Sequence, residues 1–89
     1  MNVQFKQVQF AAFNLWQAKQ LEENLKSLCD RVTIENWTGS SQNRGEPEVI
    51  VFADNVRATP SELEAIAQQS SRYVKISCFI LADGTRVFS

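Results

Sequence analysis

The chain of 89 residues contains no histidine, and it has only two cysteines, two prolines and three glycines. The absence of histidine excludes His-containing zinc sites and catalytic triads or dyads that use an imidazole base. The two cysteines, Cys29 and Cys78, are not spaced as a CxxC pair, so we interpret them as buried, reduced thiols that fill the core. We therefore expect no catalytic residue, no metal ion and no cofactor.

The sequence also lacks an apolar run near the length of a membrane-spanning helix, about 18 residues. The first residues show no charged-then-apolar signal-peptide pattern, so we expect a cytoplasmic protein. Net charge is −1, and the nine basic residues are scattered from Lys6 to Arg86. Because nucleic-acid binders gather Lys and Arg on one stripe, we expect neither nucleic acid nor membrane as a partner.

What the sequence does contain is an ordinary globular composition, with 44% apolar and 21% charged residues. This composition predicts a packed structure, and the length predicts a single domain over residues 1–89. Within residues 48–54, all five positions between the flanking acidic residues are apolar. A strand with one wet face should alternate, so this run predicts a central strand that is covered on both faces.

Two other stretches predict strands with one apolar face. Within 3–13 the apolar residues shift from odd to even positions, and a one-residue bulge near Lys6 and Gln7 would restore a single apolar face. Residues 73–81 divide into two alternating sets, which predicts a core-facing set and an outward-facing set. The core-facing set is Val74, Ile76, Cys78 and Ile80, and the large outward-facing side chains are Tyr73, Phe79 and Leu81.

Local signals mark the helices and the last turn. Asn14 predicts the start of a first helix, because its side chain can accept hydrogen bonds from the free amides of the first turn. Thr59, followed by a proline and then by Glu62, predicts the start of a second helix through a capping box. Asp83 and Gly84 predict a two-residue hairpin turn that leads to a short fifth strand.

The predicted order of elements is strand, helix, strand, strand, helix, strand, followed by a hairpin strand. Two split β-α-β units of this kind predict an α+β, ferredoxin-like sandwich, with both helices on one face of a mainly antiparallel sheet. Its first and third strands are central, which agrees with the apolar run at 48–54. The alternative is a thioredoxin-like mixed α/β sheet, which requires the first two strands to be parallel neighbours.

In the ferredoxin-like arrangement one face of the sheet has no helix to cover it. Several large apolar residues are predicted on that face, which is more apolar surface than a monomer usually exposes. Either a protein partner or a second copy covers the face, or the loop at 38–47 and the fifth strand cover it within the chain. The predicted partner-binding residues are Trp37, Phe52, Tyr73, Phe79 and Leu81.

The most site-like polar cluster is Asp54 with Arg57, directly after the central strand. Ligands in open α/β sheets bind at strand ends, where an aspartate can bind a metal or act as a base. The alternative is that Asp54 only accepts hydrogen bonds from turn amides, as Asp and Asn commonly do. We treat both residues as candidates for a ligand site.

These patterns favour a small, non-enzymatic interaction module that forms a homodimer or binds another protein through the open sheet face. The alternative is a small-molecule-binding protein or a cofactor-free enzyme built from a ferredoxin-like dimer. A closed apolar cavity between sheets, lined by Trp37, Phe52 and Phe79, would favour that alternative.

Overall fold

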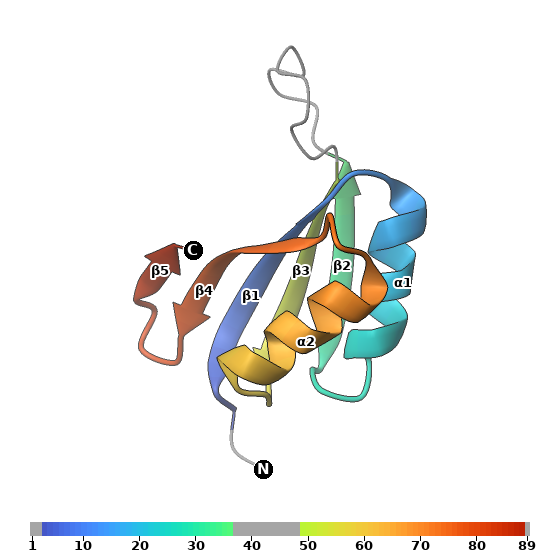
Figure 1. Cartoon of the computed structure of the whole chain (residues 1–89). Coiled ribbons are helices and arrows are strands. Elements are labelled where there is room, and N and C mark those ends of the chain that lie inside the picture. The colour runs from blue at the N-terminus through green and yellow to red at the C-terminus, as the bar shows by residue number, and fades with distance from the viewer. Residues whose placement is uncertain (1–2, 37–48, 89) are drawn as a thin grey trace.

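The computed structural model describes residues 3–36 and 49–88, which form an α+β fold of five strands and two helices (Figure 1). Trp37 and the loop at 38–47, both named above, lie outside the described residues. In chain order the elements are β1 (Phe5–Ala12), α1 (Leu15–Leu25), β2 (Arg31–Asn36), β3 (Val49–Val56), α2 (Pro60–Ser70), β4 (Lys75–Leu81) and β5 (Arg86–Phe88).

The five strands form one sheet in the order β2-β3-β1-β4-β5, and every neighbouring pair is antiparallel. The apolar run therefore lies inside the sheet, because β3 has β2 on one side and β1 on the other. A mixed sheet with β1 and β2 as parallel neighbours, the alternative considered from sequence, is wrong, since β3 separates them and no described pair is parallel.

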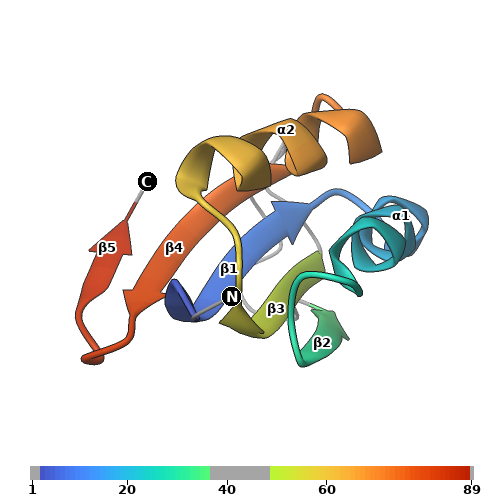
Figure 2. The ribbon, with the colours of Figure 1, turned by 90° about the horizontal axis from the view of Figure 1, so that it is seen from below.

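Both helices lie on the same side of the sheet, and the other side carries no helix of the described chain (Figure 2). The core lies between the helices and the sheet. It is formed by Ala18, Leu21 and Leu25 of α1, Leu63 and Ala67 of α2, and alternate residues of the central strands. No polar or charged residue of the described ranges is buried. We call the other side of the sheet the helix-free face.

The start of α2 is fixed by the predicted capping box. The backbone N–H of Glu62 donates to the Thr59 hydroxyl at 3.3 Å, and the Glu62 carboxylate accepts from the Thr59 N–H at 3.1 Å. Both bonds satisfy amides that have no partner inside the helix. At α1, Asn14 accepts from the N–H of Gln17 at 2.9 Å, so the predicted cap is confirmed there too.

Replacing the cap Thr59→Ala should lower the free energy of unfolding by about 1 kcal/mol, because the hydroxyl that accepts from the Glu62 N–H is lost while the backbone N–H of residue 59 remains. Urea unfolding followed by circular dichroism measures this change. Ser61→Ala is the matched control, since Ser61 is exposed in the same turn and is not the cap. Equal losses in the two variants would contradict a specific capping role.

The predicted bulge in β1 is confirmed at Lys6. Relative to β4, β1 gains one residue between Phe5 and Gln7. On the neighbouring strand, Asn55 adopts a left-handed conformation with φ of 54°. The extra residue explains why Phe5 and Val8 both face the helices although they are three residues apart.

A second bulge, in β4, was not predicted. Gln9 pairs with Cys78, but the next residue, Phe10, pairs with Ile76, so Ser77 is an extra residue in β4. The Ser77 hydroxyl donates to the carbonyl oxygen of Gln9 at 3.1 Å, which holds the bulge against β1.

The β4 bulge reverses the faces of the residues that follow it. Phe79 lies opposite Val8 and stacks on Phe5, with 4.8 Å between the ring centroids, and Leu81 packs against the same core. The prediction that Phe79 and Leu81 lie on the helix-free face is therefore wrong. Ile80 and Cys78, predicted to face the helices, lie opposite Gln residues of β1 on the helix-free face.

The turn between β4 and β5 is one residue longer than predicted. The N–H of Gly84 donates to the carbonyl oxygen of Leu81 at 2.9 Å, and the N–H of Leu81 donates to that of Thr85 at 2.8 Å. Gly84 has φ of 92°, whereas Asp83 has a negative φ. The loop is thus a turn on residues 81–84 closed by a left-handed glycine, a common three-residue hairpin connection.

Candidate functional site

Side chains on the helix-free face form three rows that cross the strands, because directly opposed residues of an antiparallel pair share a face. The charged row is Arg31, Asp54, Gln7, Ile80 and Arg86. The aromatic row is Thr33, Phe52, Gln9, Cys78 and Phe88. The mixed row is Glu35, Ile50, Ala11 and Lys75.

The aromatic row runs through the centre of the face and contains its most apolar part. Phe52 is half-buried, Cys78 is only 2% exposed, and Phe88 at the end of the row is 73% exposed. Ile50, two residues before Phe52, continues the apolar surface into the mixed row. The face thus has apolar side chains in its central row and charged side chains in the two outer rows. Protein interfaces commonly have this composition, with an apolar centre and a polar rim.

A chain of side-chain hydrogen bonds crosses the same face. Gln9 Nε2 donates to Gln7 Oε1 at 3.1 Å, and Gln7 Nε2 donates to Asp54 Oδ1 at 2.8 Å. The amides therefore bind one another and the carboxylate in fixed orientations. A polar group that already has a partner loses less free energy when a surface is covered, so this chain makes the face easier to bury.

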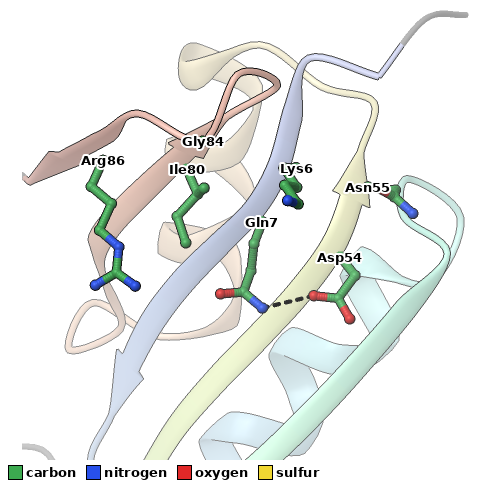
Figure 3. A pocket seen from close by; sticks show the side chains of 7 residues that line it. All are labelled: Lys6, Gln7, Asp54, Asn55, Ile80, Gly84 and Arg86. Atoms are coloured by element: carbon green, nitrogen blue, oxygen red, sulfur yellow. Dashed lines mark hydrogen bonds between the residues drawn. The ribbon is translucent and has the colours of Figure 1, made fainter.

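One end of the face is hollowed beside the charged row (Figure 3). The hollow has a volume of about 460 Å³ and is open to solvent. In Figure 3 the Gln7–Asp54 hydrogen bond lies between Arg86 and Ile80 on one side and Asn55 on the other, with the helices behind the sheet. The lining residues are Lys6, Gln7, Asp54, Asn55, Ile80, Gly84 and Arg86.

Asp54 and Arg57, predicted as one cluster, bind different partners. Asp54 accepts from Gln7 on the helix-free face, whereas Arg57 Nη1 donates to Asp30 Oδ1 at 2.7 Å. Asn55 Nδ2 donates to the other carboxylate oxygen of Asp30 at 3.0 Å. The hydrogen bonds from Arg57 and then Asn55 lower the pKa of Asp30 below its ordinary value. This arrangement ties the end of β3 to the turn before β2 and explains Arg57 as a structural residue.

The variant Asp30→Asn should make stability less sensitive to acid. Because the pKa of Asp30 is lower in the folded state, its stabilising effect is fully present above the unfolded pKa, about 4, and is lost as the pH falls through the folded pKa. Thermal unfolding between about pH 2 and pH 7 should show a smaller loss below pH 4 in the variant than in the wild type. Glu64→Gln, at an exposed position of α2, is the control. Parallel pH curves for wild type and Asp30→Asn would contradict the prediction.

Tyr73 lies just before β4 and is 47% exposed. Its ring lies 5.2 Å from the ring of Phe13, and the Arg72 guanidinium is 4.8 Å from its centroid. Of the predicted partner-binding residues, Phe52 and Tyr73 are thus accessible, while Phe79 and Leu81 pack against the core. Whether any of them binds a partner stays a prediction.

The described residues offer little for catalysis. Burial raises the pKa of the Cys29 thiol, which disfavours the reactive thiolate, and its Sγ donates to the Leu25 carbonyl oxygen at 3.2 Å. Cys29 and Cys78 are both buried and free. Within residues 3–36 and 49–88, no three acidic, cysteine or histidine side chains lie close enough to hold a metal ion.

Sequence analysis missed three residues that help to form this face. Gln7, Ile80 and Phe88 are brought together by strand pairing and by the β4 bulge, which the alternation of 73–81 conceals. The fifth strand was predicted, but its pairing partner decides which side Phe88 faces. The two glutamines on either side of Val8 were the one available signal for Gln7.

Comparison with protein-family models, with curated proteins and with solved structures found no match to this chain. Neither helix of the described ranges is long and apolar enough to cross a membrane.

Proposed function

We propose that this protein is a non-enzymatic interaction module that binds a protein partner, a second copy or another chain, through its helix-free face. The observation that carries the proposal is the aromatic row: Phe52 is half-buried on the inner strand β3, Phe88 is exposed at the end of the row, and the rows on both sides contain charged residues. Non-obligate interfaces combine such an apolar centre with a polar rim.

The proposed architecture is ferredoxin-like with an added edge strand. The strand order β5-β4-β1-β3-β2 contains the central pair β1 and β3 that two interlocked β-α-β units require. In such a sandwich the helices cover one face, so the other is free for a partner. Two free thiols are compatible with the expected cytoplasmic location.

The second candidate, small-molecule binding, is favoured only by the hollow beside the charged row. Lys6 and Arg86 could hold an acidic group there, next to the Gln7–Asp54 pair. For this alternative, the sequence predicted a closed apolar cavity lined by both Phe52 and Phe79. These residues face opposite sides of the sheet, so they cannot line one cavity.

The decisive variant is Phe52→Ser. We expect it to weaken association by tenfold or more, because an aromatic side chain at an interface centre contributes about 2 kcal/mol or more, while stability changes little. Self-association is measured by light scattering over a concentration series, and binding to another protein by pull-down from the native host with wild-type and variant baits.

Phe79→Ser is the matched control, since this phenylalanine faces the helices. It should lower stability, and the fraction that remains folded should associate normally. A protein that stays monomeric and whose captured proteins are the same with wild type and Phe52→Ser would overturn the proposed function.

A further inference from the structure

Strand β5 is exposed on both faces as well as at its outer edge. All three of its residues are exposed, with Val87 at 45% and Phe88 at 73%. Of the other described elements β5 contacts only β4, so no helix covers it (Figure 1). Val87 lies opposite Phe79 and so faces the helix side, while Arg86 and Phe88 face the helix-free side.

The two edges of the sheet differ in how they are protected. The other edge strand, β2, carries the charged residues Arg31 and Glu35 on its open side, and its Val32 and Ile34 pack against the core. Charged side chains on an edge discourage pairing with another chain. At β5 only Arg86 is charged, and the apolar side chains of Val87 and Phe88 project on opposite sides of the sheet at an edge that no other described element covers.

The hydrogen-bond pattern shows which backbone groups of β5 are free. The N–H of Leu81 donates to the carbonyl oxygen of Thr85, so these two residues form a hydrogen-bonded pair. Such pairs alternate along an antiparallel ladder, which makes Phe79 and Val87 the next one. The backbone groups of Val87 therefore point inward, and those of Arg86 and Phe88 point out from the sheet.

We propose that β5 pairs with β5 of a second copy in an antiparallel register centred on Val87, which joins two five-stranded sheets into one continuous sheet. In this register Arg86 of the first copy and Phe88 of the second copy donate their backbone N–H groups to each other's carbonyl oxygens. Phe88 of the first copy and Arg86 of the second copy do the same. Every outward-pointing backbone group of Arg86 and Phe88 then has a partner. A shift of one residue would place inward-pointing groups at the junction and form no ladder.

The side chains are self-complementary in the same register. Arg86 lies beside Phe88 of the second copy on the helix-free side, where a guanidinium over an aromatic ring is favourable. Val87 contacts Val87 of the second copy on the helix side. This is a pair without backbone hydrogen bonds, in which side chains approach most closely. Phe79 of each copy, next to Val87, extends that apolar contact.

The dimer should be weak because its interface is small. A three-residue strand pair with its side chains buries less than the roughly 1,000 Å² of a stable interface, so it forms and separates with concentration. The consequence for the proposed function is a doubled binding surface, because both aromatic rows lie on the same side of the joined sheet. The pairing itself rests on β5 and not on that function.

The register is tested by disulfide trapping with Val87→Cys in the full-length chain. Opposed residues of a pair without backbone hydrogen bonds have Cα atoms about 4.5 Å apart, within disulfide range. Under oxidised glutathione this variant should form covalent dimers at least tenfold faster than Arg86→Cys, whose cysteine lies opposite Phe88 of the second copy. Thr33→Cys on β2 and the wild type, whose two cysteines are buried, are the controls.

The wild type provides an independent measurement that requires no variant. On dilution from about 1 mM to about 10 μM, amide NMR shifts should change at residues 85–88 and at Phe79 and stay constant in β2, as expected for a weak dimer. Equal trapping of Val87→Cys and Thr33→Cys, or dilution shifts absent from β5, would overturn the pairing. Val87 faces away from the aromatic row, so the two proposals can fail separately. Val87→Cys can form no disulfide dimer while Phe52→Ser still abolishes partner binding, and Val87→Cys can form the dimer while Phe52→Ser has no effect.

Discussion

Val51→Lys should lower the free energy of unfolding by about 4 kcal/mol or more, whereas Ile50→Lys, one residue earlier in the same strand, should change it far less. Val51 is fully buried between β1 and β2 and faces the helices. An unpaired charge at such a position costs about 4 kcal/mol or more, a large part of the 5–15 kcal/mol that stabilises a typical domain. Ile50 is half-buried on the helix-free face, beside Glu35, where a lysine can reach water and a carboxylate.

Far-UV circular dichroism and thermal unfolding of the two variants measure this difference. Because both variants introduce lysine in place of a β-branched residue of the same strand, the change in net charge is the same and the changes in strand propensity nearly cancel. Equal unfolding in the two variants would mean that both faces of β3 are core, and it would contradict a helix-free face that is open to a partner.

Phe79→Ala should lower the free energy of unfolding by about 2–3 kcal/mol, somewhat less than for a fully buried phenylalanine, because Phe79 is half-buried. Part of that loss comes from its contact with Phe5, since the two ring centroids lie 4.8 Å apart. A double-mutant cycle with Phe5→Ala should give a coupling of about 0.5–1.5 kcal/mol.

Urea unfolding of the wild type, both single variants and the double variant provides the cycle. Phe52→Ala serves as the comparison on the other face and should lose about 1 kcal/mol or less, because this side chain does not pack against the helix-side core. Additive losses from Phe5→Ala and Phe79→Ala would contradict the face reversal after Ser77.

Much of the fold could be predicted because its signals are local. The cap at Thr59 depends on residues three apart, and the bulge at Lys6 appears as a shift of apolar residues from odd to even positions. The position of β3 inside the sheet agreed with the apolar run. The sequence predicted that both faces of β3 are apolar. The helix-free face of β3 is apolar at Ile50 and Phe52 but also carries Asp54, which lies within the strand.

The candidate site was less predictable because it depends on strand register. The bulge at Ser77 is hidden in the sequence because residues 78–81 are all apolar, so either alternate pair of them could face the core. What it changes is which residue of β1 each one opposes. Asp54 and Arg57 are close in sequence, yet the left-handed Asn55 between them sends their side chains to different partners. Neither effect can be inferred from residue types alone.

The extra residue Ser77 also sets how this surface can change in evolution. Deleting its single codon would remove the bulge and place Cys78 directly after Ile76, so Cys78, Phe79 and Ile80 would oppose the same β1 residues as before and keep their faces. If Ser77 were instead kept and paired as a regular strand residue, every later residue of β4 would change sides, so Phe79 and Leu81 would be presented and Ile80 hidden without any change of amino acid.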